Sequence, residues 1–140
     1  LNDQKIDVFN GGEMSRDFTY IDDVIDGIIG VLDKPATPSP TFDPLVPDPA
    51  KSNAPFRVFN IGNSNPTRLM SFISALEDAL GKKAKMNMLP MQPGDVQTTA
   101  ADISAIHQWT GFWPNTTLEE GVAQFAAWYL KYYGINYGKL

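Results

Sequence analysis

Residues 16–32 carry the sequence RDFTYIDDVIDGIIGVL, in which a short extended run over 16–20 is followed by a helical pattern. Asp22 and Asp23 fall in the first turn of that pattern, where carboxylates favour the positive end of a helix. Adjacent helix positions point about 100° apart, so this pair is better explained as helix-start charge than as an acid/base site. The apolar residues at helical spacing predict an amphipathic helix: Ile21, Val24, Ile25, Ile28, Val31 and Leu32.

Patterns on either side of this stretch predict the remaining elements. Alternation and apolar runs predict strands over 5–9, 56–62, 84–89 and 98–101. Helices are predicted over 68–80, with Thr67 as cap and Gly81 as stop, over 102–109 with Asp102 as cap, and after a capping box at 116–119. The order predicts an α/β fold with a small mixed sheet and about four helices. Because so small a sheet leaves helix faces without partners, we expect some of the fold to be missing.

The segment 34–56 differs from the rest because seven of the chain's eleven prolines lie in it and no periodicity is visible. Proline fixes φ and removes a hydrogen-bond donor, so neither a helix nor an inner strand is expected there. Periodic structure resumes at once on both sides. We therefore interpret the segment as a Pro-rich insertion within one unit spanning residues 1–140.

The amino-acid composition of the chain excludes several classes of function. The chain has 140 residues, 43% hydrophobic and 19% charged, which supports one folded core and excludes disorder as a description of the whole. No run approaches the ~20 apolar residues of a membrane span. A net charge of −5 and the absence of a basic stripe argue against nucleic-acid binding. With no cysteine, thiolate catalysis and sulfur-ligated metal are excluded, and a reducing, cytoplasmic location is expected.

Two positions favour ligand binding on chemical grounds. Arg16 follows the Gly11-Gly12 turn and precedes an extended run, so its guanidinium could bind a phosphate. The alternative is a surface ion pair with Asp17 or Glu13. Asp95 follows Pro93-Gly94 at a loop tip, where its carboxylate could accept from sugar hydroxyls or close an Asx turn. His107, the single histidine, has no spaced partners for a metal and is interpreted as an ordinary helix residue.

Four motifs in order resemble the C-terminal part of the extended short-chain dehydrogenase/reductase family. They are RDFTYIDDV at 16–24, FNIG at 59–62, PGDV at 93–96 and AD at 101–102. Within the family, the nucleotide-sugar 4-epimerases, and among them the UDP-glucuronate 4-epimerases, are most similar. FNGGEM at 9–14, APFRVFNIGN at 54–63 and MQPGDV at 91–96 are typical of that subgroup. The resemblance implies an epimerase fold from which most of the Rossmann core is missing.

The resemblance also assigns site residues. Arg16 matches the family arginine that contacts the diphosphate. Asp95 matches the family aspartate that binds the uridine ribose. The segment that flanks the uracil in the family corresponds to Val8 and Phe9. Gln92 stands where many 4-epimerases have a second phosphate-binding arginine, and the glucuronate subgroup often has glutamine there. The chain has neither the Gly-rich dinucleotide loop nor the Tyr-x-x-x-Lys of the family. NAD is therefore expected in the parent enzyme and not on this chain alone, which contributes no catalytic residue.

These residues predict a substrate-binding fragment of a UDP-glucuronate/UDP-galacturonate 4-epimerase that is inactive alone. A related sugar-nucleotide dehydratase or decarboxylase, or a stand-alone nucleotide-sugar-binding module, remain as alternatives. The expected partners are a UDP-sugar and the upstream dinucleotide-binding domain of the same protein. Without that domain, the helix from Ile21 and the strand at 58–61 would lose their covering layer, so we expect self-association.

Overall fold

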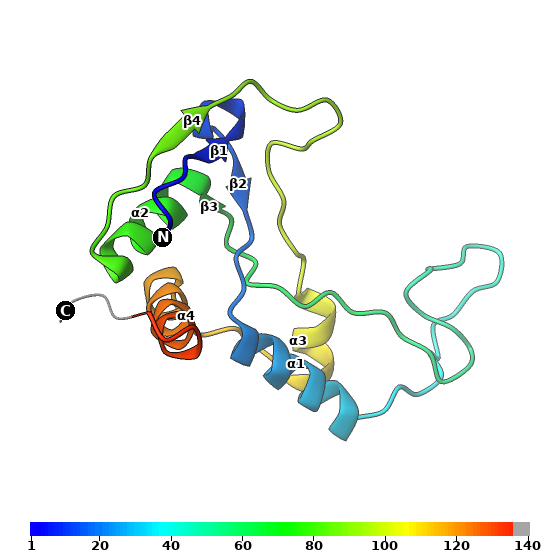
Figure 1. Ribbon diagram of the computed structural model, residues 1–140. Helices are drawn as coiled ribbons and strands as arrows, with labels where there is room; N and C mark the ends of the chain where they lie inside the picture. The colour runs from blue at the N-terminus through cyan, green and yellow to red at the C-terminus, as the bar shows by residue number, and fades with distance from the viewer. Residues whose placement is uncertain (136–140) are drawn as a thin grey trace.

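The computed structural model describes residues 1–135, which form four α-helices and four short strands (Figure 1). Strand β1 (Ile6–Val8), the 3-10 turn η1 (Phe9–Gly12) and β2 (Ser15–Arg16) precede helix α1 (Ile21–Asp33). The remaining elements are β3 (Thr67–Arg68), α2 (Leu69–Leu80), β4 (Met86–Met88), α3 (Ser104–Thr110) and α4 (Leu118–Tyr132). The α/β class and all four helices agree with the prediction.

The strands form two separate pairs, so the single small mixed sheet expected from the sequence is wrong. β1 and β4 are parallel, with Ile6 opposite Met86, and β2 and β3 are antiparallel, with Ser15 opposite Arg68. The strand predicted over 56–62 is absent, apart from an isolated bridge between Arg57 and Lys51. The run 98–101 likewise keeps only a bridge from Thr98 to Ser15. Apolar runs become strands only where another strand lies beside them.

Helix boundaries follow the sequence more closely than strands do. The capping box that opens α4 is Thr117 with Glu120, one residue later than predicted, because the Thr117 hydroxyl accepts from Glu120 N at 3.2 Å. The returning bonds from the Thr117 backbone and hydroxyl lower the pKa of Glu120. Thr67 does not cap α2, since the capping position is Arg68 and has no side-chain bond. Gly81 ends that helix at φ 60°, as predicted.

The four helices pack in two pairs (Figure 1). The segment between β2 and α1 connects the part of the molecule that holds the strands to the second pair. α2 packs against α4 beside the strands, and α1 packs against α3. The core of the second pair consists of Ile103, Ile106 and Phe112. Phe59 and Ile61 pack against this core, so the expectation that they would lose their cover is wrong.

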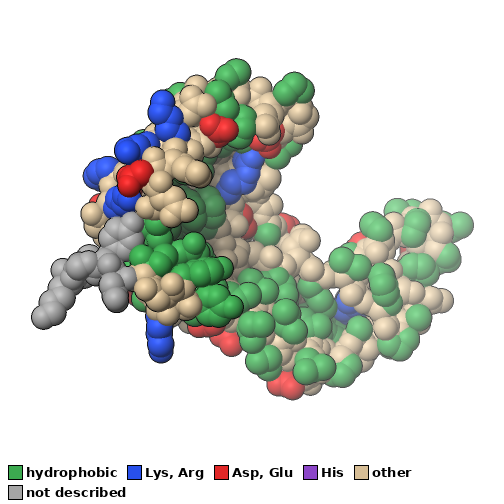
Figure 2. Space-filling model, viewed as in Figure 1, with side chains coloured by type: hydrophobic (Ala, Val, Ile, Leu, Met, Phe, Trp, Pro, Cys, Tyr) green, Lys and Arg blue, Asp and Glu red, His purple; other side chains and the backbone are tan. Residues whose placement is uncertain are grey.

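Within residues 1–135, no other element covers the outer face of α1, as predicted. On α1, Ile21 is 59% exposed and Leu32 is 73% exposed. Val58, in the run 56–62, is 52% exposed. Ile25, Ile28 and Ile29 on the same helix are also exposed. Figure 2 shows hydrophobic side chains spread over α1 and α4 on the viewed face. Apolar surface of this extent is uncommon on a soluble monomer and marks a site of contact.

The Pro-rich segment extends away from the helices as a looped excursion (Figure 1). It contains no helix or strand, as predicted, and is closed by Ser39 N donating to Ser52 O at 2.8 Å. At its base, the guanidinium of Arg57 lies over the Trp109 ring, 4.4 Å from the centroid. Within residues 1–135 no helix is long and apolar enough to cross a membrane.

Candidate functional site

Two candidate residues 79 positions apart meet in the structure. Arg16 Nη2 donates to Asp95 Oδ1 at 3.0 Å, and each side chain is 29% exposed. The other terminal nitrogen of Arg16, Nη1, donates to the carbonyl oxygens of Ser15 at 2.9 Å and Gln97 at 3.2 Å. The guanidinium is therefore held by one carboxylate and two backbone carbonyls while some of it stays in reach of solvent. The alternative that Arg16 pairs with Asp17 or Glu13 is wrong, because its carboxylate partner is Asp95 and Glu13 pairs with Arg68.

The loop 89–99 places Asp95 opposite β2. It is fixed at one end by Leu89 N donating to Val8 O at 2.9 Å, and at the other by Ser15 N donating to Gln97 O at 2.9 Å. Between these points, Asp95 N donates to Gln92 O at 3.2 Å, and Gly94 has φ 82°. A type II turn requires this left-handed conformation at its third position, which explains the Pro-Gly pair. The local sequence thus aims Asp95 at Arg16.

The other three candidate residues border the same loop. Gln92 is exposed at the first position of the turn. The Val8 side chain is 1% exposed and belongs to the core, so only its backbone faces the loop. Phe9 is half-buried at the start of η1, and Gly11 N of that turn donates to Leu89 O at 3.1 Å. All five candidates therefore lie on or beside loop 89–99, with Arg16 and Asp95 in direct contact.

Sequence reasoning missed Asp17, whose carboxylate holds two distant segments together. Oδ2 accepts from Ala101 N at 2.9 Å and from Ser64 N at 3.0 Å, and Oδ1 accepts from Asn65 N at 3.2 Å. A Cβ on Gly62 would lie 2.8 Å from Asp17 Oδ2, so glycine is needed for this approach. Because its partners are far away in the sequence, no local pattern could have revealed this role.

Asp23 has a similar role in the first turn of α1. It is 4% exposed and accepts from Asn115 N at 3.3 Å and Thr116 N at 3.2 Å. These bonds fix the segment that leads into α4. The interpretation of Asp23 as helix-start charge is incomplete, because its carboxylate also satisfies backbone groups from a segment 92 residues away.

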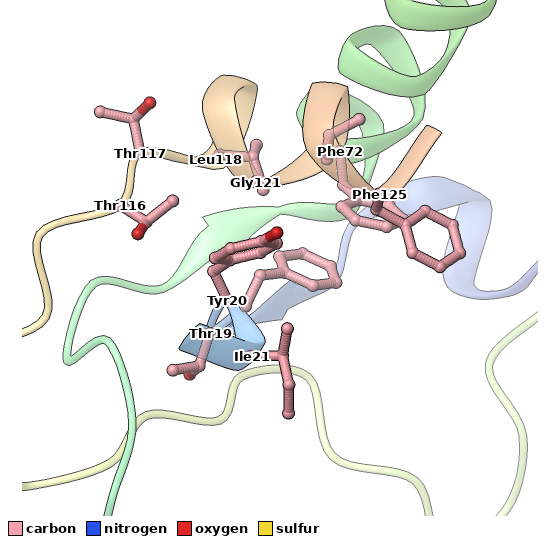
Figure 3. Close-up of a pocket in the computed structure, with 11 residues that line it drawn as sticks. Thr19, Tyr20, Ile21, Phe72, Thr116, Thr117, Leu118, Gly121 and Phe125 are labelled. Atoms are coloured by element: carbon pink, nitrogen blue, oxygen red, sulfur yellow. The ribbon is translucent and has the colours of Figure 1, made fainter. Parts of the chain in front are cut away.

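An apolar pocket of about 310 Å³ lies where β2 runs into α1 and meets the start of α4 (Figure 3). Figure 3 shows the Tyr20 ring beneath α4, with Ile21 and Phe125 at the edge of the pocket. Phe18 stacks on Phe72 at its wall, with centroids 4.2 Å apart. None of the five candidate residues lines this pocket, and no charged side chain does. It offers packing surface, whereas the charged chemistry lies at Arg16 and Asp95.

The turn after β1 is not arranged as a dinucleotide-binding loop, and no metal-ligand cluster lies among the described residues. The turn after β1 leads into β2 and not into a helix, so no helix N-terminus is presented there to a pyrophosphate. Within residues 1–135, no group of three His, Cys, Asp or Glu side chains could hold a metal ion. His107 Nδ1 lies 3.0 Å from Phe112 O, which agrees with its interpretation as an ordinary helix residue.

Comparison with known proteins places the chain in a family. Residues 1–62 match the model of the NAD dependent epimerase/dehydratase family. The chain is 43% identical over 129 residues to a probable UDP-glucuronate 4-epimerase of Rhizobium meliloti, covering 91% of this chain and 38% of that protein. The matched part of the chain, residues 1–62, belongs to the NAD-dependent epimerase/dehydratase family. It is also 47% identical over 133 residues to Protein CapI of Staphylococcus aureus, covering 95% of this chain and 40% of CapI.

A solved structure of this epimerase/dehydratase family supports the fold. The UDP-glucuronic acid 4-epimerase of Bacillus cereus, in complex with UDP-glucuronic acid and NAD, matches with a TM-score of 0.71 and 30% identity. The match covers 94% of this chain and 37% of that one. The chain is thus an α/β fragment of the extended epimerase fold, with four helices and small sheets. It spans about 40% of the length of the curated relatives it matches.

Proposed function

We propose that this chain is the C-terminal, nucleotide-sugar-binding portion of a 4-epimerase that interconverts UDP-glucuronate and UDP-galacturonate. The observation that carries the proposal is the meeting of Arg16 and Asp95 at 3.0 Å on a loop that also bears Gln92. One group suits a diphosphate and the other suits hydroxyl groups. The similarity to UDP-glucuronate 4-epimerases supports the choice of sugar.

Each candidate residue has a role at this proposed site. The Arg16 guanidinium binds the diphosphate, and the Asp95 carboxylate accepts from the ribose hydroxyls. Gln92 offers a neutral amide donor beside the phosphates, and the backbone of Val8 with the half-buried Phe9 borders the uracil. In the whole enzyme NAD would supply hydride transfer. The chain itself binds and orients the nucleotide.

The test of this proposal is binding without turnover. We expect the purified chain to bind UDP in calorimetry, and we expect no conversion of UDP-glucuronate when NAD is added. The sequence has no Gly-rich dinucleotide loop and no Tyr-x-x-x-Lys, so it lacks the groups that would hold NAD and move a proton. Measurable epimerisation by the chain, or no binding of UDP, would reject the proposal.

We also propose that the exposed face of α1 is covered by the upstream domain in the parent and by a second copy in the isolated chain. Light scattering of the isolated chain should then give more than the 15.4 kDa of a monomer. Replacing Ile25 and Ile28, which are 44% and 49% exposed, by glutamate should shift the chain toward the monomer, because a charge in a closed apolar interface is unfavourable.

The matched control for this surface is Leu45→Glu, since Leu45 is 88% exposed in the Pro-rich segment, away from α1. This variant should associate as the wild type does. A wild-type chain that stays monomeric at tens of micromolar would contradict the proposed interface.

The proposal also includes a cytoplasmic location, which is the location that the sequence predicts.

A further inference from the structure

A cavity of about 270 Å³ lies at the base of the Pro-rich segment, beside α3. Ligand pockets in proteins generally start at about 300 Å³, so a cavity of this size suits a small molecule. Two cations, Lys51 and Arg57, line it together with the rings of Phe59 and Trp109. Among residues 1–135 no acidic side chain lines it, and none of the five candidate residues of the nucleotide site does.

Arg57 is a half-buried cation without a carboxylate or carbonyl partner. Within residues 1–135 it makes no ion pair and no side-chain hydrogen bond. Its Nε is buried, whereas its two terminal nitrogens stay accessible. The guanidinium carbon lies 4.4 Å from the centre of the Trp109 ring, which attracts the positive charge but offers no oxygen to the N–H donors. An anion that accepts from the terminal nitrogens would therefore stabilise Arg57.

A second cation is placed directly opposite Arg57. Lys51 and Arg57 form an isolated antiparallel bridge, so their side chains leave the same face of it, where like charges repel. Lys51 has one carboxylate partner, Asp48, whose Oδ2 lies 3.1 Å from Lys51 Nζ. A third cation is also close, because Lys34 Nζ lies 5.1 Å from the centre of the Trp109 ring. Positive charge thus gathers around Trp109 in a chain whose net charge is −5.

We propose that this cavity binds a small organic carboxylate, with the charged end at Arg57 and Lys51 and an apolar body against Trp109 and Phe59. The two oxygens of a carboxylate match two N–H groups of a guanidinium, which gives a forked pair of hydrogen bonds. The centres of the two rings are 6.3 Å apart, and both rings offer apolar surface to the body of the ligand. Because Lys51 is already paired with Asp48, Arg57 is the uncompensated charge, and a monoanion matches it better than a dianion.

The alternative is that Arg57 stacks on Trp109 only to fasten the base of the Pro-rich segment. Other bonds already hold this base, because Val58 N donates to Ala50 O at 3.1 Å and Trp109 Nε1 donates to Lys34 O at 2.9 Å. A fastening role also predicts a different result. Loss of Arg57 would then change stability alone, and the protein would bind no carboxylate in this cavity.

The experiment is a titration of a fluorinated benzoate with the full-length protein, observed by fluorine NMR of the ligand at constant ionic strength. The corresponding fluorinated benzamide is the ligand control, because it has the same shape and no charge. We expect saturable binding of the benzoate and affinity for the benzamide that is lower by about tenfold or more, since a hydrogen bond to a charged group exceeds one to a neutral group. Arg57→Gln should weaken benzoate binding by about tenfold or more for the same reason.

Lys51→Gln should weaken benzoate binding several-fold, and it tests the site independently because Lys51 is exposed and its loss leaves the Arg57–Trp109 contact in place. Circular dichroism checks that both variants fold. The matched control is Arg68→Gln, which removes a positive charge from an exposed pair with Glu13 outside the cavity and should leave benzoate affinity unchanged. No saturable benzoate binding, equal affinity for benzoate and benzamide, or wild-type affinity in both cavity variants would overturn the proposal. None of these results bears on UDP binding, because the cavity shares no residue with the nucleotide site.

Discussion

Replacing Arg16 by alanine in the full-length protein should weaken UDP binding about 10- to 100-fold. A hydrogen bond to a charged group is worth about 1.5–3 kcal/mol, and each ~1.4 kcal/mol changes affinity tenfold. Arg16 is the positively charged side chain on the proposed diphosphate site, since Gln92 is neutral. Asp95→Ala should weaken UDP binding less, because the repulsion it removes partly offsets the ribose contact it loses. Calorimetric titration with UDP measures both changes.

Arg68→Ala provides the control for net charge. Arg68 forms an exposed pair with Glu13, and both of its bonds go to that carboxylate, at 2.9 and 3.0 Å. Its loss removes one positive charge from β3, the strand paired with β2, without touching loop 89–99. UDP affinity should stay within about twofold, since exposed pairs contribute little. Equal losses for Arg16→Ala and Arg68→Ala would remove Arg16 from the site.

Asp17→Asn should give the largest loss of stability among single polar substitutions near the site, about 2–3 kcal/mol. The carboxylate accepts three backbone N–H bonds, from Ser64, Asn65 and Ala101. Asparagine keeps the shape but offers one acceptor oxygen, and its amide turns two N–H groups toward backbone donors. The midpoint of urea unfolding measures the change, and circular dichroism confirms that the variant still folds.

Asp26→Asn is the matched control for this substitution. Asp26 is exposed on α1 and makes no hydrogen bond or ion pair within residues 1–135. Its substitution should move the free energy of unfolding by less than about 0.5 kcal/mol. If Asp17→Asn were as mild as Asp26→Asn, then Asp17 would not be the group that joins residues 64–65 to residue 101.

Helices could be predicted from the sequence because their signals are local. Apolar spacing predicted a helix from Ile21 to about Leu32, and α1 runs over Ile21–Asp33. The stop at Gly81 also follows from one residue, since glycine readily adopts the left-handed conformation found there. The exposed face of α1 was predictable for a related reason. The apolar face of a helix packs against another element, and the sequence predicts too few strands to cover it.

Features that join distant segments could not be predicted this way. The run at 56–62 has the composition of a strand, but no neighbouring strand lies along it, and it packs as an extended segment on Ile103 and Ile106. Separate local patterns indicated Arg16 and Asp95 as binding residues, and no sequence pattern predicts that the two side chains pair. Asp17 contacts residues 47 to 84 positions away, a relation that only the fold reveals.

The most direct test of the central claim is a crystal structure of the full-length protein with UDP bound. The account predicts a diphosphate within hydrogen-bonding distance, about 3 Å, of the Arg16 guanidinium. It also predicts the ribose hydroxyls against Asp95 Oδ2, with the Arg16–Asp95 contact retained. A diphosphate bound elsewhere, with Arg16 and Asp95 both free of the nucleotide, would contradict the claim that this chain grips the nucleotide sugar.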